Sequence, residues 1–215
     1  MARRGRPRAF DRDAALRSAM DLFWAVGYEA ATLEDLQAAM GGIAPPSFYA
    51  AFGSKERLFW EVVELYRATV GSGPAQALAG HATARDAVEA MLREAALSFC
   101  TPGKPRGCLL VSGAMTCSRA SQGVHDLLLQ LRRLAPEAIR QRLERGVADG
   151  DLPPTLDLDP IVSFYATVLY GLAVRARDGA EDASLMAAVG GAMAAWEALI
   201  TSLDSSSVTS NAVEE

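Results

Sequence analysis

The sequence has little of the chemistry on which most catalytic and metal sites depend. Its 215 residues include two histidines, His81 and His125, and three cysteines, Cys100, Cys108 and Cys117. The cysteines are separated by eight and nine residues, unlike those of a disulfide framework or a zinc site. We recognise no phosphate-binding loop and no arrangement of a nucleophile with a base. We therefore expect no metal, no cofactor and no enzymatic activity.

Long hydrophobic runs are also missing. No stretch of eighteen apolar residues occurs, so we expect no membrane-spanning helix. The basic residues at the start are followed by Asp11, Arg12 and Asp13 rather than by an apolar segment, so we expect no secretory signal. These features favour a reduced protein in the cytoplasm. The hydrophobic share is nevertheless 50%, which is enough for a sizeable core.

The charge is unevenly distributed along the chain. The formal net charge is −5, yet residues 1–8 contain no acid and four arginines: Arg3, Arg4, Arg6 and Arg8. A basic arm on an acidic protein is typical of local DNA binding. Within the arm, the sequence RGRP resembles the core of an AT-hook, in which an extended backbone places arginines such as Arg4 and Arg6 in an A·T-rich minor groove. A solvated run of charge is the alternative interpretation.

The spacing of apolar residues and helix-breaking residues predicts an all-α protein of about nine helices. Four of them fall near 12–26, 33–40, 45–52 and 55–70. Asp11 and Thr32 are expected to cap the first two helices, and Gly41-Gly42 to end the second. Pro45 and Pro46 suit only the first turn of a helix.

The rest of the chain is expected to form a larger helical unit. Residues 71–81 are rich in Gly, Ala, Ser and Pro and are interpreted as a junction. Asp159 is expected to cap a helix that begins at Pro160, and Pro136 to kink a long helix. The five expected helices lie near 84–100, 107–118, 121–149, 160–177 and 184–203.

The second and third helices have the pattern of a helix-turn-helix, in which the second helix of the motif enters the major groove. Ile43, Phe48 and Phe52 are spaced to face the first helix, so the remaining side chains of the predicted reading helix face outward. This helix lacks the Arg, Lys, Asn and Gln that usually recognise bases. Thymine methyl groups are the expected partners of Pro45, Pro46, Ala50 and Ala51. Polar contacts are expected from Ser47 and Tyr49, and phosphate contacts at Thr32 and Lys55. Tyr49 as a core aromatic and Lys55 as an ordinary surface lysine are the alternatives.

Residues 10–66 resemble the N-terminal domain of TetR/AcrR-family transcriptional regulators, through FDRDAALRSAMDLFWAVGYEAATLEDL and FYAAFGSKERLF. The resemblance implies an all-α homodimer, usually a repressor, that binds double-stranded DNA and holds a small-molecule effector in its larger domain. It places DNA contacts on Thr32, Pro45, Pro46, Ser47, Tyr49, Ala51 and Lys55. Two departures matter: Gly42 lengthens the turn, and Ala51 stands where the family often has a histidine.

The implied organisation is a basic arm at 1–9, a DNA-binding domain at 10–54 and a connecting helix at 55–70. An effector-binding and dimerisation domain at 71–203 and a flexible tail at 204–215 complete it. The last two helices mix small and bulky apolar residues, which suits a four-helix bundle shared by two subunits; an internal core is the alternative.

The effector pocket is expected among the helices before these two, and it suits an apolar or aromatic ligand. Its candidate lining residues are Met91, Phe99, Leu110, Met115, Leu128 and Phe164, each of which is otherwise an ordinary core residue. Ligand binding is expected to move the connecting helix like a lever. An alternative is a thiol-based redox or metal-responsive regulator that uses Cys100, Cys108 and Cys117; free buried cysteines are the commoner occurrence.

Overall fold

The computed structural model describes residues 11–204. Arg4, Arg6 and all but the first residue of the 204–215 tail therefore lie outside the described residues. Within that range the chain is all-α, as predicted, and its only β-structure is an isolated bridge between Leu156 and Asp204. The N-terminal helices are α1 (Arg12–Val26), α2 (Leu33–Ala39), α3 (Pro45–Phe52) and α4 (Lys55–Ala68). The later ones are α5 (Gly73–Ala79), α6 (Ala84–Ser98), α7 (Leu109–Ser112), α8 (Gln122–Ala148), α9 (Leu158–Arg177), α10 (Asp182–Ala194) and α11 (Trp196–Leu203).

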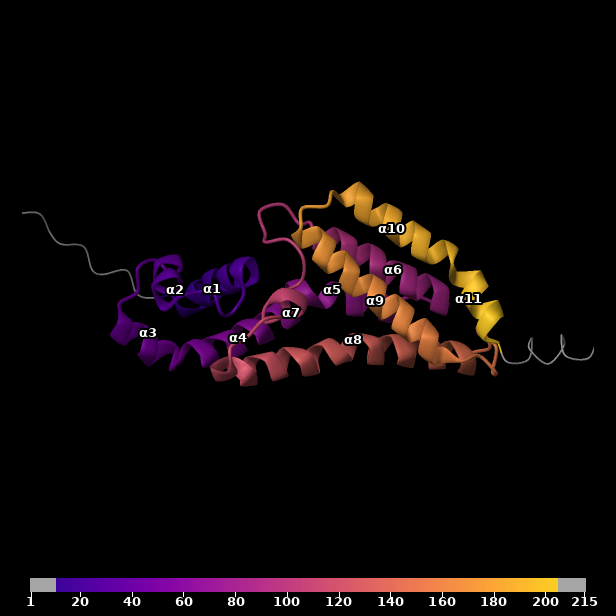
Figure 1. Cartoon of the computed structure of the whole chain (residues 1–215), viewed down its shortest axis with the longest axis horizontal. Coiled ribbons are helices and arrows are strands. Elements are labelled where there is room, and N and C mark those ends of the chain that lie inside the picture. The colour runs from indigo at the N-terminus through magenta and orange to yellow at the C-terminus, as the bar shows by residue number, and fades with distance from the viewer. Residues whose placement is uncertain (1–10, 205–215) are drawn as a thin grey trace, which may run out of the picture.

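The helices form an elongated molecule with a small unit at one end. Figure 1 shows α1, α2 and α3 at that end and α6, α9, α10 and α11 at the other, with α8 running along one side. Helix α4 leads from the small unit into the larger one. Short 3₁₀ turns at Val70–Ser72 and Arg119–Ser121 join α4 to α5 and precede α8.

An aromatic core holds the small unit together. Phe23 and Trp24 of α1 are fully buried and pack edge-on against Phe59 and Tyr66 of α4, with ring centroids 5.0 and 5.1 Å apart. Full burial of side chains of this size contributes about 1.5–3 kcal/mol each. Leu128 of α8 belongs to the same core, so the larger unit contributes directly to the packing around α1.

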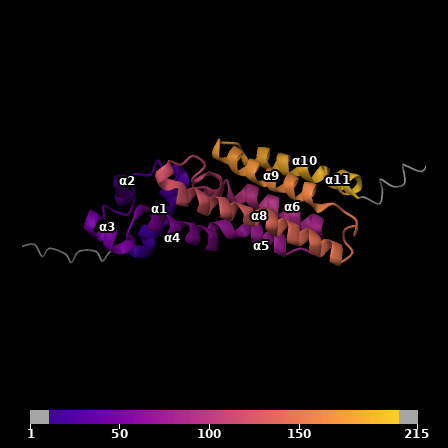
Figure 2. The same cartoon turned by 60° about the horizontal axis from the view of Figure 1, so that its bottom comes forward.

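The second core lies between α6, α8, α9 and α10 and is built from aliphatic residues around Tyr165 and Trp196. Tyr165 is fully buried, and its hydroxyl donates to the carbonyl of Ala192, which ties α9 to α10. Helix α5 covers α6 and α8 from the side (Figure 2).

Residues 71–81 are the main correction to the expected helices. They were interpreted as a junction, but Gly73–Ala79 is helix α5. Gly73 and Pro74 lie in its first turn, the Ala, Gln and Leu residues that follow favour a helix, and Leu78 is buried against the larger core.

Three helix boundaries were also wrong. The helix expected at 107–118 is the single turn Leu109–Ser112, since Gly107 has a φ of +84° and Gly113 follows the turn. Helix α9 begins at Leu158 because the Asp157 side chain, not that of Asp159, caps it. The helix expected at 184–203 is divided at Ala195 into α10 and α11. Helix α8 continues through Pro136.

Candidate DNA interface and ligand cavity

The turn between α2 and α3 depends on two glycines. Gly41 and Gly42 have φ values of +84° and +77°, a region that side chains with a Cβ rarely adopt. Their N–H groups donate to the carbonyls of Ala38 and Gln37 at 3.0 and 2.9 Å and so satisfy the end of α2. The additional glycine is therefore part of an ordered helix stop that sets where α3 begins.

Helix α3 presents one face to solvent and one to the core. Phe48 and Phe52 are buried, whereas Tyr49 is 48% exposed and Ser47 and Ala50 are exposed. Pro45 and Pro46 at the start of α3 are also exposed, and Ala51 is half-buried. The outward set named from the sequence is thus accessible, and Tyr49 is not a core aromatic.

Arg12 fixes the far end of α3, a role that the sequence did not indicate. Its guanidinium donates to the carbonyl of Ala51 at 3.3 Å and to Glu61 of α4 at 2.6 Å. It also lies 4.8 Å from the ring centroid of Phe52. One side chain of α1 therefore connects α3 and α4, and an arginine just after a helix cap carries no sequence signal that points to this.

The two predicted phosphate-binding residues already have partners within the chain. The Asp35 N–H donates to the Thr32 hydroxyl oxygen and the Thr32 N–H donates to the Asp35 carboxylate, which forms a capping box. The Thr32 hydroxyl also donates to Asp35 at 2.6 Å, and the hydrogen bonds from the Thr32 hydroxyl and N–H lower the pKa of Asp35. The Lys55 ammonium lies 4.4 Å from the ring centroid of Tyr28, and burial lowers the pKa of Lys55. Lys55 is therefore positioned by an aromatic ring and is not an ordinary surface lysine.

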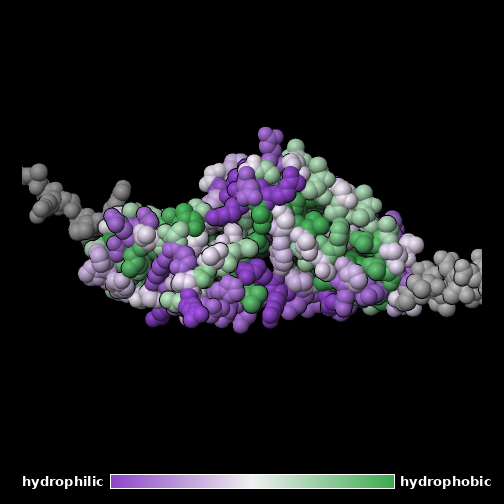
Figure 3. Space-filling model, viewed as in Figure 1, coloured by the Kyte–Doolittle hydropathy of each residue, from purple (hydrophilic) through white to green (hydrophobic). Residues whose placement is uncertain are grey.

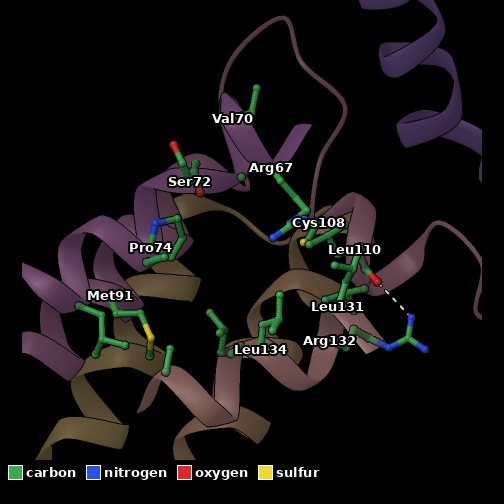
Figure 4. Close-up of a pocket in the computed structure, with 18 of the residues that line it drawn as sticks. Arg67, Val70, Ser72, Pro74, Met91, Cys108, Leu110, Leu131, Arg132 and Leu134 are labelled. Atoms are coloured by element: carbon green, nitrogen blue, oxygen red, sulfur yellow. Dashed lines mark hydrogen bonds between the residues drawn. The ribbon is translucent and has the colours of Figure 1, made fainter. Parts of the chain in front are cut away.

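A cavity of about 510 Å³ lies behind the small unit. It is bounded by the last turn of α4 and by α5, α6, α7, α8 and α9 (Figure 4). Three of the candidate lining residues, Met91, Phe99 and Leu110, line this cavity. The other three lie elsewhere, for reasons that periodicity does not reveal. Met115 follows α7 and is 63% exposed, and Leu128 is buried in the small unit's core.

Phe164, the third of these, lies on the outer side of α9. It lines a second hollow of about 340 Å³ between α9 and α10, together with Val168, Gly171, Ala188 and Gly191. Figure 3 shows apolar surface spreading over the part of the molecule that contains α9 and α10.

The wall of the cavity is bonded to the small unit. The Trp24 indole N–H donates to the carbonyl of Gly107 at 3.2 Å, and the Tyr28 N–H donates to that of Gly113 at 2.7 Å. These two glycines flank α7, which contributes Leu110 and Val111 to the cavity. The small unit thus contacts the cavity through both α4 and α7.

The three cysteines do not share a site. Cys100 accepts from Arg106 at 3.0 Å, the Cys108 thiol interacts with the Tyr66 hydroxyl, and Cys117 lies 3.7 Å from the Ala114 carbonyl. Burial raises the pKa of each thiol, which reduces its thiolate fraction at neutral pH. In residues 11–204 no three potential ligands are grouped to hold a metal ion. Nothing in this arrangement favours the redox or metal-responsive alternative.

Comparison with known proteins agrees with this geometry. The family model "Bacterial regulatory proteins, tetR family" matches residues 15–62, and "Tetracyclin repressor-like, C-terminal domain" matches residues 84–189. The HTH-type transcriptional repressor ComR of Escherichia coli K12 is 33% identical over 198 residues, which cover 92% of this chain and 94% of ComR. The chain belongs to the TetR family of transcriptional regulators.

Two further relatives extend the comparison. The HTH-type transcriptional repressor BdcR of E. coli K12 is 30% identical over 200 residues, covering 93% of this chain and 94% of BdcR. A structure of the TetR-family regulator CifR, with cysteine substitutions and bound to 26-bp double-strand operator DNA, superposes with a TM-score of 0.84. It is 46% identical and covers 89% of this chain and 100% of that one. As a TetR-family regulator, the chain binds double-stranded DNA, and its helix-turn-helix is the element suited to that.

Proposed function

We propose that the protein is a repressor in the cytoplasm that binds a palindromic operator as a homodimer and is released by a small apolar or aromatic molecule. ComR and BdcR carry the name of repressor, and CifR was solved on operator DNA. The observation that carries the proposal is the path of α4. It begins at Lys55 beside the reading helix and ends with Tyr66 and Arg67 at the cavity.

On DNA, α3 occupies the major groove. Its outward side chains are mostly apolar, so thymine methyl groups are the natural partners of Pro45, Pro46, Ala50 and Ala51. Ser47 and the Tyr49 hydroxyl make the polar contacts. Lys55 and the start of α2 at Thr32 meet phosphates, and Arg4 and Arg6 of the arm enter the adjacent minor groove.

Thr32 acts in this scheme through the backbone. Its hydroxyl proton is used in the bond to Asp35, so the hydroxyl has no proton left to donate to a phosphate. The capping box instead holds the first turn of α2 in place, and the N–H groups of that turn are the donors directed at the DNA backbone.

Ligand binding changes DNA affinity by moving α4 away from α7. A ligand shifts such an equilibrium only by its difference in affinity between the two states. Because the cavity lies against both attachments of the small unit, a ligand that widens it separates α4 from α7. The two reading helices of a dimer, which must lie roughly 34–36 Å apart for half-sites one turn apart, then lose their spacing.

The dimer forms through α9 and α10. A Cβ added to Gly171, Gly190 or Gly191 would meet no atom within 4 Å, so packing inside one chain does not require glycine there. Close packing against a second copy of the chain does require glycine at these positions. By length and composition, residues 182–203 are apolar enough to pass as a membrane helix. In a dimer, the second copy would cover the exposed apolar face of this segment.

The test is binding of the chain to DNA taken from upstream of its own coding sequence, followed by fluorescence anisotropy at fixed salt. We expect Tyr49→Ala to weaken binding by about tenfold and to leave the melting temperature unchanged, since Tyr49 is exposed. Gln141→Ala, an exposed position on α8 far from α3, is the matched control. Equal affinity of the wild type and the Tyr49 variant would overturn the assignment of α3 as the reading helix.

A further inference from the structure

The charged residues that line the cavity are all positive. Of the described residues that line it, the ionised ones are Arg67 and Arg132, and the lining includes neither Asp nor Glu. The other polar lining groups are neutral side chains of Tyr, Ser, Gln and Cys. An apolar cavity with two guanidinium groups and no carboxylate favours a negatively charged ligand.

Neither arginine is neutralised by a buried partner. Arg67 pairs with Glu64 at 2.9 Å, but the Glu64 side chain is 68% exposed, and such surface pairs contribute little. Arg132 donates to the carbonyl of Leu110 at 3.1 Å, and a carbonyl is neutral. The Arg67 charge is therefore available to a bound anion, and the Arg132 charge acts on the cavity from beyond Leu110.

The charge of Arg132 acts on groups inside the cavity. Burial raises the pKa of Tyr170 and that of Cys108, and the Arg132 charge opposes the shift in both cases. The Tyr170 hydroxyl also donates to the Arg132 carbonyl, which holds α9 against α8 at this point. The cavity wall near Arg132 is thus an electropositive surface on a fixed helix pair.

The charged and apolar parts of the lining are separated in space. Figure 4 shows Arg67 beside Cys108 and Met91 at the opposite end. Arg132 lies beyond Leu110, and its guanidinium points away from the other drawn side chains, toward the Leu110 carbonyl oxygen. Leu134, from the middle of α8, lies between Met91 and Arg132. A ligand that fits this distribution has an anionic head at one end and an apolar body at the other.

We propose that the effector is an amphipathic organic monoanion whose acidic group binds near Arg67 and Arg132 and whose apolar body extends toward Met91. This proposal rests on the proposed function, which makes the cavity the effector site. A carboxylate buried in apolar surroundings is strongly unfavourable unless it is paired. The Arg67 guanidinium supplies that pairing, and the nearby charge of Arg132 adds to it. A cationic ligand would be repelled by both arginines, and a neutral ligand would gain nothing from their charge.

Two fluorescent probes that differ by one acidic group provide the test, with DNA-free protein. They are 1-anilinonaphthalene-8-sulfonate and its uncharged parent N-phenyl-1-naphthylamine. We expect Arg67→Met to weaken binding of the sulfonate by about tenfold and Arg132→Met to weaken it by a smaller factor. Both variants should weaken binding of the parent by less than about twofold. Arg133→Met, next in the chain and exposed, is the matched control and should change neither.

Further variants assign the site and guard against misfolding. Ala138→Trp fills the cavity and should abolish binding of both probes, and Arg67→Lys should retain most of the sulfonate affinity because it keeps the charge. Decanoate should displace the sulfonate at lower concentration than decanol or decylamine. Parallel losses for both probes, sulfonate binding that survives Ala138→Trp, or stronger displacement by decanol would overturn the proposal.

Operator DNA then separates this inference from the function on which it rests. Binding of decanoate in the cavity without release of DNA supports the anionic ligand class and contradicts ligand-driven release. Release of DNA by decanol as readily as by decanoate supports the release mechanism and contradicts the anionic ligand class.

Discussion

The Nη1 atom of Arg177, at the end of α9, donates to the carbonyl oxygen of Trp24 in the last turn of α1 at 3.1 Å. The Nη2 atom of the same guanidinium donates to the carbonyl of Ala25, and Nη1 also lies 3.2 Å from the Ser112 hydroxyl of α7. A cation at the C-terminal carbonyls of a helix is favourably placed in the helix dipole. The helix that carries the proposed subunit interface is therefore bonded directly to the DNA-binding unit, in parallel with α4.

Replacing this arginine should loosen the small unit. We expect Arg177→Met to lower the free energy of unfolding by about 1–2 kcal/mol, because three hydrogen bonds are lost from a partly exposed site. Amide hydrogen exchange should rise in the last turn of α1 and in α7. Arg145→Met, which removes an exposed pair with Asp149 at the end of α8, is the control. Unchanged exchange at Trp24 and Ala25 would show that these bonds do not hold the unit.

Arg12 should influence DNA binding without touching DNA. Its bonds to Ala51 and Glu61 set the angle of α3 on α4, so Arg12→Met should weaken operator binding by about tenfold, or 1.4 kcal/mol. Glu61→Gln keeps a hydrogen-bond acceptor for Arg12 and should have a smaller effect. Circular dichroism should be unchanged in both variants. Equal affinity of Arg12→Met and the wild type would mean that α3 is positioned by Phe48 and Phe52 alone.

The role of the arginines of the N-terminal arm can be tested by the salt dependence of operator affinity. If Arg4 and Arg6 bind the minor groove, replacing either with Ala should reduce the slope of log affinity against log salt by roughly one unit. The loss of affinity should be larger on operators with an A·T-rich flank than on operators with a G·C-rich flank. Arg17→Ala, an arginine of α1 beyond the arm, provides the comparison. An unchanged slope would show that Arg4 and Arg6 do not bind DNA and that the arm is a solvated run of charge.

The sequence predicted well what local signals determine. Capping by Asp11 and Thr32, the glycine turn and the proline start of α3 are encoded within a few residues, and the structure has each of them. Helix α5 was missed because Gly71, Gly73 and Pro74 have the composition of a junction, although residues 75–79 favour a helix. The single turn of α7 is bounded by Gly107 and Gly113, which are visible in the sequence, whereas no glycine or proline stands at the division at Ala195.

In the site too, local patterns were predicted correctly and contacts between distant segments were not. The outward face of α3 follows from the spacing of Phe48 and Phe52, which is a local pattern. The cavity lining combines six helices, and periodicity shows only that a residue is apolar, not which of two cores it joins. Leu128, which was expected to line the pocket, lies in the core of the small unit, and apolar periodicity gave no signal for Arg67 and Arg132 as lining residues.

Glu29 connects the small unit to the segment before α8 and makes its attachment sensitive to acid. Hydrogen bonds from Ser121 and Ser118 lower its pKa below the usual value. A carboxyl group whose pKa is lower in the folded state stabilises that state at pH values above its pKa in the unfolded chain. This contribution is lost as the pH falls through the pKa of the folded state. Glu29→Gln should therefore flatten the decrease in melting temperature below about pH 5. Glu34→Gln, an exposed acid of α2, should leave the decrease unchanged.

The subunit interface can be tested at a glycine that the single chain does not need. Gly191 lies on the α9–α10 hollow and has open space where a Cβ would be, so Gly191→Arg is compatible with the fold of one chain. If two copies meet there, the variant should sediment as a monomer with an unchanged helical spectrum. Its operator affinity should fall by at least about tenfold, because two half-sites are no longer bound by one linked pair of reading helices. Ala183→Arg, exposed on the same helix but outside the hollow, should remain dimeric. A dimeric Gly191→Arg with normal operator affinity would place the subunit contact on another face of the molecule.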